Sequence, residues 1–164
     1  MLSAGNRFPN FALPNQDGKM TLLGDFAGHW LVVYFYPKDD TPGCTIQGKS
    51  MTATKADFDD AGIKVVGVSA DDVASHKEFA EKHSLPFTIL ADPTKQTAKA
   101  YGVLITMMGV FELAQRDTFI IDPQGRIAKH WAKVEPKGHS ELVLKELESL
   151  QAKASPVAAP AKTG

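Results

Sequence analysis

An unbroken run of apolar and aromatic residues, Leu31 to Tyr36, is the feature that most constrains how this chain can fold. Such a run predicts a β-strand that is buried on both faces. Pro37 should end the strand because proline has no backbone N–H to donate to the ladder. After a short polar turn a helix can begin near Pro42, since proline is tolerated in a first helical turn. The sequence therefore predicts a central strand that leads through a loop into a helix.

The single cysteine of the sequence, Cys44, falls at the start of that predicted helix. Open α/β sheets bind ligands beyond the carboxyl ends of their strands, which is where this residue should lie. The unpaired N–H groups of a first helical turn favour the thiolate form, and no acidic residue stands at positions 45–47 to oppose it. A lone cysteine is more often a buried structural residue. The Thr-Pro-Gly sequence that precedes Cys44 favours a reactive thiol instead.

The residues around Cys44 resemble those of a known enzyme family. Pro37, Thr41 and Cys44 reproduce the Pro-x-x-x-Thr-x-x-Cys signature of the peroxiredoxins, and the string FYPKDDTPGCT is similar to the bacterioferritin-comigratory, or Q-type, subgroup. A second string, Arg116 to Asp122, resembles the family's Arg-x-Thr-Phe-Ile-Ile-Asp strand. The resemblance extends from about Arg7 to Leu150. It implies a thioredoxin-like fold and an antioxidant thiol-dependent peroxidase that reduces hydrogen peroxide and organic hydroperoxides.

The other elements are predicted from apolar runs and turn signals. An N-terminal β-hairpin should turn at Asp17-Gly18, a pair that favours tight β-turns. Further strands are expected at 63–69, 87–90, 118–121 and 126–131, and helices at about 42–61, 73–83, 94–101 and 141–152. Residues 104–115 show no clear period and are predicted to form an irregular apolar loop with some extended parts. This order predicts an α/β fold with a central mixed sheet flanked by helices.

Length and composition indicate one domain with a substantial core. The chain has 164 residues, of which 43% are hydrophobic, and its net charge of −1 gives no general attraction to nucleic acid or membrane. We expect the domain to span residues 1–152 and the Ala/Pro/Lys-rich segment 153–164 to be disordered, because that segment buries too little to offset its ordering entropy. The first residues lack the apolar segment of a secretion signal, and a single free thiol fits a reducing compartment. We therefore expect a cytoplasmic protein.

The resemblance implies a role for each residue near the thiol. Cys44 would attack a peroxide oxygen as a thiolate and become a sulfenic acid. The backbone N–H groups of Gly43 and Cys44 would stabilise the charge that develops on oxygen. The Thr41 hydroxyl can accept from the peroxide while it donates toward sulfur, and Arg116 can hold both groups. Pro37 would shield the sulfur from water. No cofactor and no metal are expected.

Several other residues are assigned weaker roles. Gln47 stands where the subgroup commonly has Glu and is a candidate hydrogen-bonding partner within the site. Tyr34 and Tyr36 are predicted to pack in the core, although one of them could line the pocket. The five histidines form no predicted site, and His76 and His83, seven residues apart, should share a solvated face. Asp39-Asp40 is interpreted as a solvated turn. Gly48 within the helix is either tolerated or lets the first turns open easily.

The chain departs from many Q-type members because it has no second thiol. Their resolving cysteine lies five residues after the first, where this chain has Lys49, or on the following helix, where this chain has none. Oxidised Cys44 therefore cannot form a disulfide within one copy of this chain. We expect a one-cysteine cycle in which glutathione, a glutaredoxin or a thioredoxin reduces the sulfenic acid. The resemblance favours a monomer, with a dimer as the alternative.

Two other functions remain open on the same fold. One is a thiol–disulfide exchanger, which is disfavoured by the missing Cys-x-x-Cys and by Arg116-Asp117 where such proteins usually carry a cis-proline. The other is a redox sensor that signals to a partner through sulfenylated Cys44. Steady-state peroxide turnover with an added thiol would distinguish an enzyme from a sensor.

Overall fold

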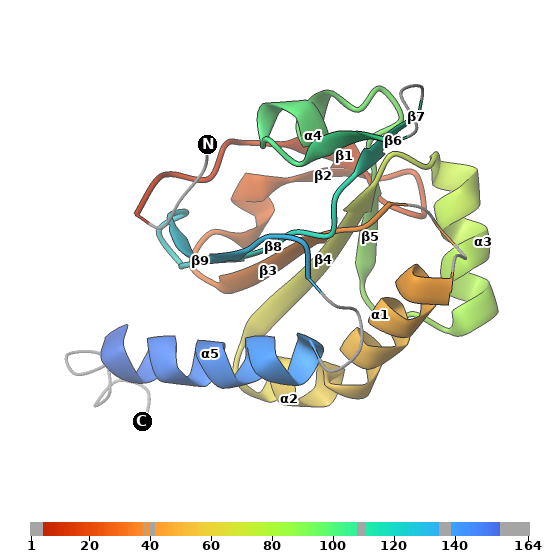
Figure 1. Ribbon diagram of the computed structural model, residues 1–164. Helices are drawn as coiled ribbons and strands as arrows, with labels where there is room; N and C mark the ends of the chain where they lie inside the picture. The colour runs from red at the N-terminus through yellow and green to blue at the C-terminus, as the bar shows by residue number, and fades with distance from the viewer. Residues whose placement is uncertain (1–4, 38, 40–41, 108–110, 135–138, 155–164) are drawn as a thin grey trace.

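A mixed β-sheet forms the centre of the molecule (Figure 1). The computed structural model describes residues 5–37, 39, 42–107, 111–134 and 139–154. Within them the sheet has five strands in the order β5 (Thr88–Ala91), β4 (Ile63–Ser69), β3 (Trp30–Phe35), β8 (Thr118–Ile121) and β9 (Ile127–Trp131). Strands β3, β4 and β5 run parallel, whereas β8 and β9 are antiparallel to their neighbours. The predicted mixed α/β sheet is confirmed.

Strand β3 is central because both of its faces are apolar. Leu31, Val33 and Phe35 belong to one buried cluster, and Val32 and Tyr34 belong to a second cluster on the opposite face. Side chains alternate between the two faces of a strand, so an uninterrupted apolar run can satisfy two cores at once.

Helices cover the face that carries Tyr34. Residues of α1 (Pro42–Ala53), α2 (Lys55–Asp60), α3 (Val73–His83) and α5 (His139–Ala154) join that cluster, among them Met51, Phe58, Phe79 and Leu147. The opposite face is covered by α4 (Gln96–Ala100), the 3₁₀ helix η1 (Leu23–Phe26) and the hairpin of β1 (Ala12–Pro14) and β2 (Met20–Leu22). Figure 1 shows α4 and the hairpin on one side of the sheet and α5 and α2 on the other. The predicted N-terminal hairpin is therefore present.

The helix predicted over 42–61 is divided in two. Its break falls at Thr54, whose hydroxyl donates to the carbonyls of Ser50 and Met51. A threonine side chain that bonds back to the preceding turn competes with the regular helical pattern, which accounts for the interruption. Gly62 has the positive φ of 74° that was expected where the helical segment ends.

The prediction of an irregular loop at 104–115 is wrong. This segment forms a hairpin of β6 (Leu104–Met107) and β7 (Phe111–Ala114), with Ile105 opposite Leu113. The extended parts pair with each other and so satisfy their backbone hydrogen bonds. Residues 104–115 contain no Asn-Gly or Asp-Gly pair, which would have indicated the turn.

The end of the chain is only partly described. Helix α5 begins at His139 and ends at Ala154, two residues beyond each predicted boundary. Residues 155–164 lie outside the described part, so the predicted domain limit and disordered tail stay predictions. Among the described helices, none has the length and apolar character needed to cross a membrane.

Candidate active site

Cys44 lies in the first turn of α1, just beyond the carboxyl end of β3. Its side chain is 2% exposed and packs in the cluster that contains Tyr34 and Tyr36. The first turn of α1 carries no acidic residue. The predicted position of the thiol is thus confirmed, while its environment is more enclosed than a helix start on the surface would be.

Arg116 reaches this helix from the β8 side of β3, which is the side away from β4. It precedes β8, which pairs with β3 so that Thr118 lies opposite Tyr34. Two backbone hydrogen bonds hold the segment: the Phe35 N–H donates to the Asp117 carbonyl at 2.8 Å, and the Val134 N–H donates to the Arg116 carbonyl at 2.7 Å. These bonds place Arg116 beside the end of the central strand.

The Arg116 guanidinium is bonded to Gln47, one helical turn after Cys44. Nη1 donates to Gln47 Oε1 at 3.0 Å, and Gln47 is 1% exposed. The other amide atom of Gln47, Nε2, is buried and has no hydrogen-bond partner among the described residues. Positions three apart on a helix share a face, so the bond brings a permanent positive charge toward the turn that carries the thiol.

Tyr34 packs in the core, as the sequence predicts, and it also interacts electrostatically with the residues of the site. Burial raises the pKa of Tyr34 well above its usual value of 10, and the negative charges of Cys44 and Asp39 raise it further. The Arg116 charge acts in the opposite direction. The hydroxyl therefore stays protonated at neutral pH and lies within the electrostatic reach of all three groups.

An apolar pocket opens next to Arg116. Its volume is about 330 Å³, and its wall is formed by Pro37, Ile105, Leu113, Ala114, Gln115, Arg116, Lys133 and Val134. Pro37 is half-buried there. Ile105 and Leu113 come from the β6–β7 hairpin, so the segment that the sequence left irregular supplies part of the pocket.

The structure brings together four of the predicted residues. Arg116 is hydrogen-bonded to Gln47, one helical turn after Cys44 in α1, and Pro37 shares the pocket with Arg116. Gly43 lies in the first turn of α1. Thr41 lies outside the described residues, so its role stays a prediction.

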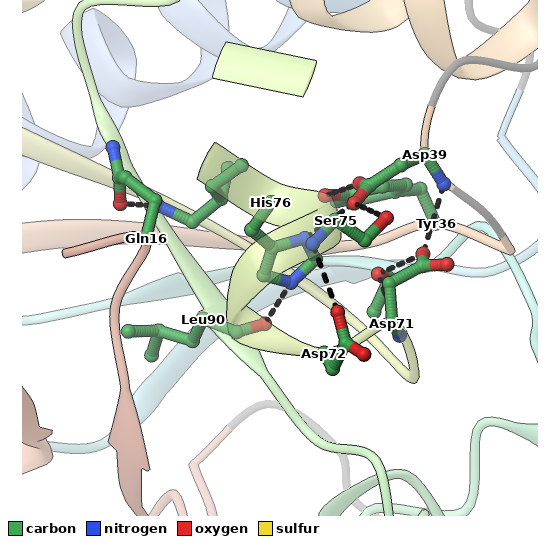
Figure 2. A network of polar contacts seen from close by, with 10 residues as sticks. Gln16, Tyr36, Asp39, Asp71, Asp72, Ser75, His76 and Leu90 are labelled. Carbon is green, nitrogen blue, oxygen red and sulfur yellow. Dashed lines mark hydrogen bonds and ion pairs between the residues drawn. The ribbon is translucent and has the colours of Figure 1, made fainter. Parts of the chain in front are cut away.

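The prediction that Asp39 and His76 are solvated is wrong. Asp39 is 7% and His76 0% exposed, and Asp39 Oδ2 lies 2.6 Å from His76 Nδ1 (Figure 2). A signal for this burial was present in the sequence. His76, Phe79 and Ala80 follow the i, i+3, i+4 spacing of the inward face of a helix, and all three are buried in α3.

Comparisons with known proteins identify the family of this chain. Residues 4–130 match the family model described as "AhpC/TSA family". A relative named peroxiredoxin Bcp, from Xanthomonas campestris, is 42% identical over 135 residues, which cover 80% of this chain and 84% of the relative. The chain belongs to the peroxiredoxin family. It is thereby a thiol-dependent peroxidase, which uses a hydroperoxide and a thiol reductant.

Other peroxiredoxins extend the agreement to the whole fold. The chloroplastic peroxiredoxin Q of Oryza sativa is 41% identical over 150 residues, 91% of this chain and 68% of that relative. A solved structure of a cysteine-to-serine mutant of Xylella fastidiosa PrxQ is 32% identical with a TM-score of 0.87, covering 91% of this chain and 97% of that one. The solved bacterioferritin comigratory protein of Xanthomonas campestris is 37% identical with a TM-score of 0.83, covering 90% and 98% of the two chains. The predicted Q-type resemblance and thioredoxin-like fold are confirmed.

Proposed function

We propose that Cys44 is the residue that reacts with the peroxide in this peroxidase. The observation that carries the proposal combines two features near one thiol. Cys44 lies in a first helical turn that has no acidic residue, and the Arg116 guanidinium is hydrogen-bonded to Gln47, one turn further along the helix. Both features bring positive electrostatic potential close to the sulfur, where an attacking anion is stabilised.

The reaction at Cys44 is a displacement on oxygen. The thiolate sulfur forms a bond to one peroxide oxygen while the O–O bond breaks, and the leaving oxygen takes a proton to give water or an alcohol. The Arg116 guanidinium and the N–H groups of Gly43 and Cys44 stabilise the charge on the leaving oxygen. Thr41 positions the peroxide through its hydroxyl, and Pro37 keeps water from the sulfur.

The pocket beside Arg116 supports organic hydroperoxides as substrates in addition to hydrogen peroxide. Its wall is mainly apolar, with Ile105, Leu113 and Val134 next to Pro37. An alkyl group bound there would remove apolar surface from water while its peroxide group pointed toward Arg116. The Xanthomonas campestris structure is described by its alkyl peroxide reduction activity, which agrees with this proposal.

Reduction of the sulfenic acid requires a thiol from outside the chain, because the sequence contains no second cysteine. The first external thiol forms a mixed disulfide with Cys44 and releases water; the second displaces Cys44 as a thiol. Glutathione, a glutaredoxin or a thioredoxin would serve. We further propose that the protein acts as a monomer in the cytoplasm, with Gln47 holding Arg116 in place.

The test is to follow oxidation of Cys44 by mass spectrometry. The cysteine peptide should gain about 16 Da with one equivalent of peroxide and about 32 Da with excess, as a sulfenic and then a sulfinic acid form. Peptide mapping is required because the five methionines can also take up oxygen. Cys44→Ser should abolish peroxide consumption with each reductant. A cysteine peptide that stays unmodified in excess peroxide would rule out this role for Cys44.

A further inference from the structure

Asp39, in the loop between β3 and α1, is held by a buried hydrogen-bond network (Figure 2). Its Oδ1 accepts from the Tyr36 hydroxyl at 2.6 Å, and its Oδ2 accepts from the Ser75 hydroxyl at 2.8 Å. His76 Nδ1 lies 2.6 Å from the same Oδ2. The Asp39 backbone N–H donates to Asp71 Oδ2 at 2.8 Å. Asp39 is thereby tied to Tyr36, directly after β3, to α3 and to the segment that precedes α3.

Both ring nitrogens of His76 are hydrogen-bonded. Nε2 donates to the Leu90 carbonyl, 2.8 Å away, because a carbonyl can only accept. Nδ1 lies 2.6 Å from Asp39 Oδ2, which is the distance of a short hydrogen bond. The His76 ring is thus held between β5 and Asp39.

The network also contains a grouping of possible metal ligands. Asp39, Asp71 and His76 have ligand atoms within 4.8 Å of one another. The same side chains take part in the hydrogen bonds of the network, including the Ser69 hydroxyl that donates to Asp71 Oδ2 at 2.6 Å.

We propose that Asp39 and His76 are positioning residues for the peroxide reaction, an inference that rests on the proposed role of Cys44. Asp39 stands two residues after Pro37 and two before Thr41. An extended residue spans at most about 3.6 Å, so a fixed Asp39 limits how far Pro37 can move from one anchored point. Displacement of reacting or binding groups by about 1 Å can cost roughly 100-fold in rate. The hydrogen bonds that hold Asp39, which we call the Asp39 clamp, therefore act on the reaction through the loop, without touching the substrate.

The experiment compares two reactions of the same sulfur. The rate constant of Cys44 with hydrogen peroxide depends on the loop donors, whereas alkylation by iodoacetamide depends on the thiolate and on access to it. Asp39→Ala should lower the peroxide rate roughly 10- to 100-fold and leave the alkylation rate within about threefold of wild type. His76→Phe should behave in the same way.

Asp39→Asn is the matched conservative variant. The amide oxygen can accept from Tyr36, and the amide NH₂ can donate to Ser75 and to the lone pair of a neutral His76. This variant should keep the peroxide rate within about threefold of wild type, because every bond to the loop is retained. His83→Gln, at the end of the same helix, serves as a control that should change neither rate.

Three results would overturn the clamp. Asp39→Ala could retain the wild-type peroxide rate, it could lose both rates by the same factor, or Asp39→Asn could be as slow as Asp39→Ala. If Asp39→Ala does not fold, Ser75→Ala removes one bond to Oδ2 and must lower the peroxide rate selectively, by about fivefold; a rate within about threefold of wild type contradicts the proposal. A wild-type Cys44 that reacts with peroxide no faster than free cysteine would instead contradict the proposed function.

Discussion

Replacement of Gly67 by alanine should destabilise the protein through Tyr34. Gly67 lies in β4 directly beside Tyr34 of β3, and a Cβ at this position would stand 2.8 Å from Tyr34 Cζ and 2.9 Å from its hydroxyl oxygen. Carbon atoms in favourable contact are about 3.5–4.0 Å apart, so the ring would have to move by roughly 0.7–1.2 Å. Tyr34 is 1% exposed and packs against Tyr36 and Phe87, which leaves it little room.

The expected cost of Gly67→Ala is about 2 kcal/mol. Overpacking a filled core costs roughly 1–3 kcal/mol, and this contact falls on a rigid ring. The smaller conformational entropy of the unfolded alanine chain offsets about 0.4–1 kcal/mol of it. Urea unfolding followed by far-UV circular dichroism would give the change from the shift in midpoint, provided that the denaturant slope is unchanged.

Gly48→Ala is the matched control because it makes the same chemical change in a buried helix. Its Cβ would approach Leu85 Cδ2 at 3.3 Å, the end of a side chain that can move. Alanine also gains about 0.5–1 kcal/mol over glycine in a helix, so this variant should stay within about 0.5 kcal/mol of wild type. In a Tyr34→Leu background the cost of Gly67→Ala should fall by at least about 1 kcal/mol. An unchanged cost in that background would refute the steric reasoning.

Two further predictions concern a charge and a buried ring. Arg116→Ala should lower the peroxide rate constant of Cys44 roughly 10²- to 10³-fold in stopped-flow measurements, and it should cost about 1–3 kcal/mol in urea unfolding because Gln47 loses its bonded partner; a variant with normal kinetics would remove Arg116 from the site. Burial lowers the pKa of His139 from 6.5 to about 4, so the folded state binds fewer protons than the unfolded state in that range and loses stability as the pH falls from about 6.5 through 4. The full difference corresponds to about 3.4 kcal/mol, of which about 2 kcal/mol falls between pH 7 and pH 4.5. His139→Phe should lose that part of the change in unfolding free energy between pH 7 and pH 4.5, and an equal pH dependence in both proteins would contradict the assignment.

The sequence predicted those parts of the fold that depend on local pattern. The apolar run before Pro37 gave the central strand, shifted by one residue, and the segment 73–83 gave α3 with its boundaries. Asp72 caps α3 by accepting from the Ser75 N–H, a local interaction that sequence spacing can reveal. The β6–β7 hairpin was missed because its pairing depends on two apolar segments that meet without a recognisable turn signal.

Some features of the candidate site can be predicted from neighbouring residues, whereas others depend on residues that are distant in sequence. The position of Cys44 at a helix start follows from its immediate neighbours. The nearby cation, Arg116, is hydrogen-bonded to Gln47 and lies 69 residues away from it in sequence. Asp39 looked like a surface residue because its partner His76 lies 37 residues further along the chain. A polar side chain can be buried once its hydrogen bonds are satisfied, and the sequence does not show which distant residue will satisfy them.

The dependence on distant contacts determines how the active loop can be engineered. Most residues assigned to the reaction are close together in sequence, but the groups that hold them come from the segment before β8, from α3 and from the segment before α3. A transplanted loop that contained Pro37 to Cys44 alone would lack both the guanidinium and the hydrogen-bond partners of Asp39 on Asp71, Ser75 and His76. Since reaction rates depend steeply on the placement of donors, such a transplant should yield a thiol that alkylates normally and reduces peroxide slowly. Adding the partners of Asp39 and Gln47 should restore the peroxide reaction, because those distant contacts turn a short motif into a site.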